Sequence, residues 1–288
     1  MRLAPLLAVP LLLAACGSTP GSASGKVDVV AAAYPFAWLA AQVGGPDVTV
    51  SDLVKPGAEP HDIELSPRQV AAVQQAAVVV YVKGFQAAVD DALGGGKQGF
   101  NLGTVVTQQP LVGGTEATSN DPHIWLDPVR MQTAATALAD RLSAKDPAHA
   151  AGYRGRAAAV TGELTALDAT FRTSLKGCAR KDIVTSHSAF GYLATRYGLV
   201  QKGISGLTPD AEPSPKRIAE VARFAKQNGV KTIFFESLID PKVAKTVASE
   251  IGAKTAVLDP VEGVRGGDDY LSVQKRNAAT LHDALGCA

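Results

Sequence analysis

The sequence predicts an α/β protein in which two lobes, each built on a parallel sheet, are joined by one long helix. Two features of the 288-residue chain support this prediction. Apolar runs of strand length alternate with helical patterns in both halves, and one much longer helical pattern separates the halves. Continuous apolar strands with helices between them are typical of parallel sheets that helices cover on both faces. The hydrophobic content of 46% fits a globular protein rather than a disordered chain.

Seven runs have the composition of β-strands. They lie at residues 26–34, 48–54, 76–84, 100–106, 182–187, 231–237 and 254–260. Two of the intervening helices have clear starts, because Ser66 and Ser214 each offer an N-cap hydroxyl directly before a proline. Proline is favoured at the first helical position, where its missing N–H would have no partner in any case.

The longest helical pattern covers residues 148–177. Apolar or small side chains recur there at gaps of three and four, from Tyr153 to Leu175, and so form one helix face. Such a helix would be about 40 Å long, well above the usual length. We interpret it as a connecting helix between an N-terminal lobe, 27–147, and a C-terminal lobe, 178–288. A long core helix within a single domain is the alternative.

The first 26 residues are expected to lie outside the fold. An apolar run from Leu3 to Ala15 follows Arg2, and it has the length of a signal-peptide core, too short to span a bilayer. The sequence LAAC that ends at Cys16 resembles a bacterial lipobox. This implies removal of residues 1–15, lipidation of Cys16, and a flexible lipidated tether over 16–26. An ordinary signal peptide with an unmodified cysteine is the alternative.

Charge and cysteine content narrow the possible functions further. The net charge is +1, from 28 basic and 27 acidic residues, so no basic surplus is available for binding nucleic acid. Two cysteines remain beyond the signal segment, Cys178 and Cys287. An even pair outside the cytoplasm favours a disulfide, with two separate thiols as the alternative.

Three of the five histidines lie where a site could form. His61 and His187 follow predicted strands, and ligands of parallel α/β sheets bind beyond the carboxyl ends of strands. His123 stands between two Asp-Pro steps, which restrict the backbone on both sides. His149 and His282 fall on predicted helices, and we expect them to be solvent-facing or structural.

A carboxylate could complete a site with these histidines. Asp259 ends the last predicted strand, and Glu236 ends the strand before it as a competing candidate. Near His123, Asp121 and Asp127 are expected to act in turns and caps, and either could orient the imidazole from behind. Both tryptophans, Trp38 and Trp125, are expected in the core, because buried aromatic side chains most often serve packing.

Six motifs together resemble a known family. They are GAEPHDIELSP, NDPHIWLDPVR, TSHSAFGYLATRYGL, EPSPKRIAEV, IFFESLI and VLDP, in this order. The set resembles the metal-binding solute receptors of bacterial ABC importers that take up zinc and manganese, and it covers essentially the whole mature chain. The resemblance implies two lobes, each with a four-stranded parallel sheet flanked by helices, joined by one long rigid helix. It also implies a monomer, anchored outside the cell membrane by its lipid, that delivers its ion to a membrane permease.

The resemblance further implies a ligand set. Carried over motif by motif, the metal ligands fall on His61, His123, His187 and Asp259, with Glu236 near the site. Three imidazoles and one carboxylate suit Zn²⁺ in a tetrahedral shell, whereas Mn²⁺ prefers more oxygen ligands. In the family, manganese receptors often have glutamate where this chain has His187. Because protons compete for the imidazoles, affinity should fall below about pH 6.5.

Manganese remains the alternative ion. Many zinc receptors of this family have a histidine-rich loop before the second ligand, and residues 107–120 here contain no histidine.

Three other classes of protein are alternatives. A zinc hydrolase needs an open metal position and a general base. The chain has no HExxH motif, Asp259 would fill the open position, and Glu236 could act as base only if Asp259 stayed unbound. A serine hydrolase would need a GxSxG elbow, which Ser186 lacks. A surface adhesin is the third class, but nothing in the sequence encodes adhesion. We therefore expect a binding protein and not an enzyme.

Overall fold

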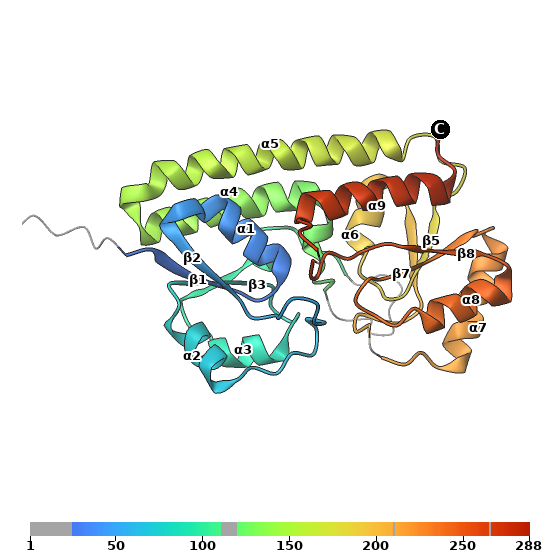
Figure 1. Ribbon diagram of the computed structural model, residues 1–288, viewed down its shortest axis with the longest axis horizontal. Coiled ribbons are helices and arrows are strands. Elements are labelled where there is room, and N and C mark those ends of the chain that lie inside the picture. The colour runs from blue at the N-terminus through green and yellow to red at the C-terminus, as the bar shows by residue number, and fades with distance from the viewer. Residues whose placement is uncertain (1–24, 111–119, 210, 265) are drawn as a thin grey trace, which may run out of the picture.

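The computed structural model describes residues 25–110, 120–209, 211–264 and 266–288. The signal peptide 1–15, Cys16 and most of the tether 16–26 lie outside these residues, as do residues 111–119 of the loop before His123. The described chain forms two four-stranded parallel sheets, one on each side of the molecule, with a long helix running along both (Figure 1). This confirms the predicted fold class.

The N-terminal sheet has the strand order β2-β1-β3-β4, and every neighbouring pair is parallel. Its strands are β1 (Val27–Ala31), β2 (Val48–Asp52), β3 (Val78–Tyr81) and β4 (Gly99–Asn101). The helices between them are α1 (Tyr34–Gly44), α2 (Pro67–Gln75) and α3 (Ala87–Leu93). Ser66 caps α2 as predicted, since its hydroxyl accepts from the Gln69 backbone N–H.

The C-terminal sheet repeats this layout with the order β6-β5-β7-β8. Its strands are β5 (Asp182–Thr185), β6 (Val200–Gly203), β7 (Thr232–Phe235) and β8 (Lys254–Val257). The helices of this lobe are α6 (Gly191–Tyr197), α7 (Pro215–Gln227), α8 (Lys242–Ile251) and α9 (Tyr270–Leu285). The side chain of Ser214 caps α7, as the sequence indicated.

Two strands differ from the sequence prediction. The run at 100–106 was expected to be a strand throughout, but β4 ends at Asn101. There the Asn101 side chain accepts from the Gly103 backbone N–H and starts a short 3-10 turn, Leu102–Thr104. Strand β6 was absent from the seven predicted runs. It lies at a sheet edge and contains polar residues, so it lacks the apolar run that marks a central strand.

The connecting helix is α5, Ala150–Ser174, which falls within the predicted range 148–177. Its buried residues keep the predicted gaps of three and four: Tyr153, Ala157, Val160, Leu164, Leu167 and Phe171. This face packs on α4 (Pro128–Lys145), on α1 of the N-terminal lobe and on α9 of the C-terminal lobe. Figure 1 shows α5 spanning both lobes, with α9 lying alongside its C-terminal part.

A disulfide within the C-terminal lobe and an ion pair between the lobes add to this packing. Cys178 and Cys287 form the predicted disulfide, which ties the end of the chain to the residues that follow α5. Asp127 at the start of α4 is fully buried and accepts two hydrogen bonds from Arg196 of α6, at 2.9 and 2.7 Å. Arg130 contacts the same carboxylate. Within the described residues, no helix has the length and apolar content needed to cross a membrane.

The apolar interior divides into two parts. A large core joins the N-terminal lobe, α4, α5, α9 and one face of the C-terminal sheet. A small core lies on the other face of that sheet, under α7 and α8. Alternate residues of one strand face opposite sides, so Ile183 belongs to the large core and Val184 to the small core.

Candidate metal centre

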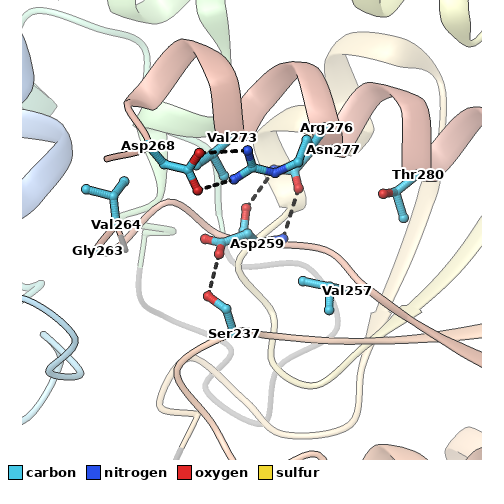
Figure 2. Close-up of a pocket in the computed structure, with 10 residues that line it drawn as sticks. All are labelled: Ser237, Val257, Asp259, Gly263, Val264, Asp268, Val273, Arg276, Asn277 and Thr280. Carbon is cyan, nitrogen blue, oxygen red and sulfur yellow. Dashed lines mark hydrogen bonds and ion pairs between the residues drawn. The ribbon is translucent and has the colours of Figure 1, made fainter. Parts of the chain in front are cut away.

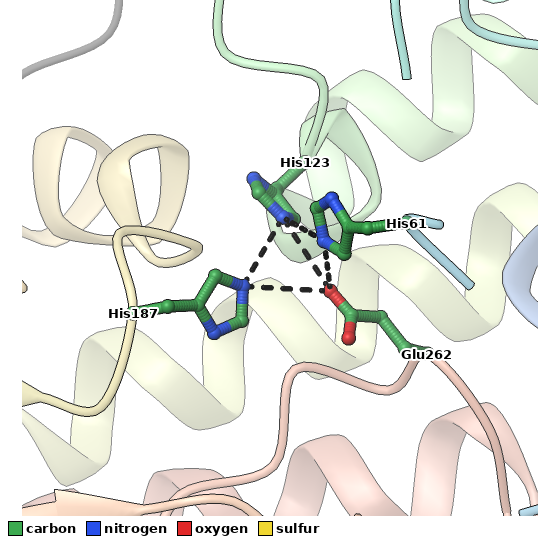
Figure 3. Close-up of side chains that lie close together, drawn as sticks. All are labelled: His61, His123, His187 and Glu262. Atoms are coloured by element: carbon green, nitrogen blue, oxygen red, sulfur yellow. Dashed lines mark hydrogen bonds and ion pairs between the residues drawn. The ribbon is translucent and has the colours of Figure 1, made fainter. Parts of the chain in front are cut away.

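Three histidines and one glutamate converge between the lobes. The Nε2 atoms of His61 and His123 lie 3.3 Å apart, and those of His123 and His187 lie 3.4 Å apart. Glu262 directs its Oε1 at all three Nε2 atoms, at 3.3, 3.4 and 3.6 Å (Figure 3). All four ligand atoms lie within 4.8 Å of one another, and all four residues are buried.

His61 comes from the loop between β2 and α2. The loop is held at Pro60, whose carbonyl accepts from the Gln86 side-chain amide, and the same amide donates to the Ala32 carbonyl of the first strand's loop. The His61 ring meets the Phe85 ring edge-on, with 4.7 Å between centroids. These contacts hold the loop and the ring of His61 in position.

His123 is fixed from behind by Asp121. One carboxylate oxygen of Asp121 accepts from the His123 backbone N–H at 2.9 Å and lies 2.8 Å from Nδ1. This contact directs Nε2 toward the site and favours a proton on Nδ1, the tautomer that a metal ligand needs. Trp125 packs 5.1 Å from the ring, and Asp127 caps α4, in line with the turn and cap roles expected for this segment.

His187 lies two residues beyond the end of β5 and is oriented by Glu236. Oε1 of Glu236 lies 2.6 Å from Nδ1 of His187 and also accepts a hydrogen bond from Ser186. The His187 carbonyl accepts from Thr185 and Gln201, so its backbone is held as well. Glu236 therefore acts on the imidazole and not on the space between the four ligand atoms.

Asp259, the carboxylate expected to complete the set, is not in the cluster. Its side chain accepts from the Ser237 hydroxyl (Figure 2). It also accepts from the Val261 backbone N–H at 2.7 Å. It lines a cavity that none of the four cluster side chains lines, near Asn277 of α9. The prediction of Asp259 as the fourth ligand is thus corrected, because Glu262 takes that place in this structure.

Backbone geometry explains why Glu262 reaches the site. Val261 has a φ of 59°, a left-handed conformation that a β-branched residue rarely adopts. The Asp259 carboxylate on the Val261 N–H and the Trp125 indole N–H, 2.7 Å from the Pro260 carbonyl, hold this turn in place. In the sequence, the only indication of Glu262 as a ligand was that it is the second acidic residue in the segment DPVEG.

Burial and neighbouring charges shift the pKa values of the four ligand groups in opposite directions. Burial lowers the pKa of His61, and the hydrogen bond to Glu262 offsets this only in part. For His187, burial also acts to lower the pKa, but the Glu236 and Glu262 carboxylates outweigh it and raise the pKa to about 10. Burial would raise the pKa of Glu262, yet its contacts with the three imidazoles hold that pKa well below the usual value. The carboxylate is thus ready to act as an anionic ligand.

The remaining sequence predictions concern residues away from the cluster. Trp38 and Trp125 are both buried, as expected. The His149 side chain is half exposed beside Asp146, and Nδ1 of His282 lies 2.8 Å from the Ser174 carbonyl, so neither contributes to the site.

The cluster has the size of a tetrahedral metal site. Four ligands at Zn–N and Zn–O bond lengths of about 2.05 Å define a tetrahedron with edges of about 3.3 Å. Five of the separations in the cluster lie between 3.3 and 3.6 Å. Three imidazoles, which bind a metal in their neutral form, and one carboxylate, with carboxylates behind two of the rings, form a donor set suited to a divalent ion.

Fold and site together define a two-lobed protein with a buried metal centre at the seam between its lobes. Residues 29–284 match the family described as zinc-uptake complex component A, periplasmic. The chain is 36% identical over 300 residues to the high-affinity zinc uptake system protein ZnuA of Bacillus subtilis, covering 96% of this chain and 94% of that protein. The chain therefore belongs to the ZnuA family of zinc-uptake components.

Other relatives are longer. The zinc-binding protein AdcA of Streptococcus pyogenes serotype M6 is 38% identical over 290 residues, which cover 90% of this chain but 56% of AdcA. The chain thus spans little more than half the length of these relatives.

Solved structures agree with the fold. The laminin-binding protein Lmb of Streptococcus agalactiae, described as an adhesin with metal-transporting activity, superposes with a TM-score of 0.82 at 34% identity, covering 90% of this chain and 99% of that one. The Zn(II)-bound ZnuA-like domain of Streptococcus pneumoniae AdcA gives a TM-score of 0.77 at 35% identity, covering 91% and 99%.

Proposed function

We propose that this protein is a zinc receptor that captures one Zn²⁺ between its lobes, with His61, His123, His187 and Glu262 as ligands. The observation that carries the proposal is the set of 3.3–3.6 Å separations between four buried ligand atoms, which fits a closed tetrahedral shell. Each lobe supplies two ligands, so the ion would hold the lobes together.

Zinc is favoured over manganese. Three of the four donors are nitrogen, and Mn²⁺ prefers oxygen ligands in greater number. The zinc named for ZnuA and AdcA supports the same choice.

Binding rather than catalysis fits the arrangement of carboxylates. A zinc hydrolase would need an open position for water and a base beside it. Here Glu262 occupies the fourth position, and Glu236 lies behind the His187 ring.

Delivery to a membrane permease is the second part of the proposal. The family is named for a component of a zinc-uptake complex, and Streptococcus pneumoniae AdcA is described as a zinc-binding lipoprotein. We infer that Cys16 is lipidated and anchors the receptor at the outer side of the cell membrane. Mass spectrometry of the membrane fraction tests this: a diacylated Cys16 peptide is expected, and soluble protein with an unmodified cysteine would contradict it.

Metal analysis tests the capture site. Purified protein should bind one zinc per chain in a competition titration, and manganese should not displace it. His123→Ala should abolish stoichiometric binding, whereas His149→Ala, a matched change at an exposed histidine, should leave it intact. Equal zinc binding by both variants would overturn the proposed site.

A further inference from the structure

The buried cluster needs a path by which an ion can reach it. His123 and His187 are 0% exposed, Glu262 is 2% exposed and His61 is 8% exposed. The cavity near Asp259 and the cavity near Ser186 are lined by none of these four side chains. A third cavity, of about 390 Å³, is lined by Glu262 itself. We call this third cavity the seam cavity.

The seam cavity lies at the junction of the lobes. Its remaining lining residues are Tyr34, Asp52, Val54, Lys55 and Pro56 of the N-terminal lobe with Gly263 and Val264 of the C-terminal lobe. An opening at this junction leads to the one ligand that both lines the seam cavity and contacts all three histidines.

The mouth of the seam cavity is suited to a cation. Asp52 is exposed, and its carboxylate is used only in part, by the Val54 backbone N–H at 2.9 Å. Burial, followed by the carboxylates of Asp269, Asp268 and Asp52, raises the pKa of the Tyr34 phenol to about 12. Of these carboxylates, Asp52 lines the seam cavity, whereas Asp268 is paired with Arg276. The Asp52 carboxylate at the mouth attracts divalent cations. Lys55 is the opposing charge.

Glu262 is placed to move aside. It follows Val261, whose left-handed backbone is strained, and strain of this kind often occurs at switching segments. Figure 3 shows the second carboxylate oxygen of Glu262 pointing away from the three imidazoles. A rotation of this side chain into the seam cavity would open the cluster without moving a histidine.

We propose that Zn²⁺ enters and leaves through the seam cavity, where Asp52 binds the incoming ion first and Glu262 is the ligand that swings to admit it. This inference rests on the proposed zinc site and adds a route to it. A residue that lies on the route, unlike a ligand, changes the free-energy barrier that the ion crosses both when it enters and when it leaves. Association and dissociation rates should therefore change by the same factor, while the equilibrium Kd stays nearly constant.

Stopped-flow kinetics with zinc and a competing chelator measure both rates, and the fluorescence of Trp125 beside His123 reports occupancy. Asp52→Asn keeps an acceptor for the Val54 N–H but removes the charge, and it should slow both rates by about fivefold. Lys55→Gln should speed both by a similar factor. Lys55→Trp, which narrows the mouth at an exposed position, should slow both by about tenfold. Ala211→Trp in the cavity near Ser186 is the matched control and should change neither rate.

The outcomes separate the route from the site. In one outcome, zinc binding requires His123, but the association and dissociation rates are unchanged in the Asp52 and Lys55 variants. This result would overturn the route and leave the site intact. Slower rates in Ala211→Trp alone would place the route through the cavity near Ser186 instead. A change in Kd as large as the change in the association rate would make Asp52 part of the binding site instead. Failure of the wild type to bind zinc would overturn the proposed function.

Discussion

The N-terminal lobe supplies His61 and His123 from loops that pack against the large core, whereas the C-terminal lobe supplies His187 just beyond β5 and Glu262 from the turn at Val261. His123 has Asp121 behind it and Trp125 beside it. Glu262 has only a strained turn before it, which contacts from other segments hold in place. The comparison indicates that His123 is fixed by its own segment, while Glu262 depends on how the lobes meet, because Trp125 of the N-terminal lobe holds the turn before it.

The largest expected effect is on zinc affinity, and it should differ between the two halves. His123→Ala removes a fixed imidazole from a closed shell and should raise the Kd for zinc by about three orders of magnitude. Glu262→Ala should raise it by only about 100-fold, because water can enter from the seam cavity and take the open position. Chelator competition measures both values. An effect of Glu262→Ala equal to that of His123→Ala would remove the distinction between the halves.

The next largest effect is expected on stability, when the ion pair between Asp127 and Arg196 that joins the lobes is removed. Asp127→Ala removes a buried carboxylate that caps α4 and pairs with Arg196 of α6, leaving the guanidinium without its partner. The free energy of unfolding in denaturant should fall by about 3 kcal/mol. On the same helix, Asp140→Ala removes an exposed carboxylate paired with Arg154 and should change stability by less than about 0.5 kcal/mol. Equal costs for the two would show that Asp127 does not join the lobes.

A smaller effect on zinc affinity is expected from the carboxylates that contact the Nδ1 atoms of His123 and His187, one in each lobe. Asp121→Asn acts on the N-terminal half and Glu236→Gln on the C-terminal half, and each removes a charge without changing the shape of the side chain. Each should raise the Kd for zinc by about 10-fold, the lower end of the usual range for such partners. The readout is again chelator competition. An unchanged Kd in both variants would show that the imidazole rings do not need these carboxylates to orient them.

The smallest effect concerns the small core itself. Helices α7 and α8 cover only this core, so they should open at a free energy about 2 kcal/mol below that of α4 and α5. Hydrogen–deuterium exchange measured helix by helix tests this. Uniform protection across α4, α5, α7 and α8 would mean that the two cores unfold as one.

The sequence predicted most of the fold because central strands have a strong signal. The strands β1, β3 and β7 consist mainly of apolar residues, β5 has Ile183 and Val184 at its centre, and α5 carries its buried face at regular gaps. The edge strand β6 contains polar residues, and β4 ends where the Asn101 side chain starts a turn. Both features depend on local contacts that composition does not reveal.

The site was predictable to the extent that its residues follow strands. His61 and His187 lie beyond the carboxyl ends of β2 and β5, and His123 lies in a restrained frame. Glu262 was missed because its position depends on the left-handed turn at Val261. That turn is held in part by Trp125, distant in sequence, whose indole N–H donates to the Pro260 carbonyl.

A zinc-bound crystal structure with anomalous data at the zinc edge tests the central claim most directly. The account predicts one zinc peak per chain at the seam between the lobes, with bonds of about 2.0–2.2 Å to the Nε2 atoms of His61, His123 and His187 and to a Glu262 carboxylate oxygen. A peak bonded to Asp259 in place of Glu262, or no peak among the three histidines, would contradict it.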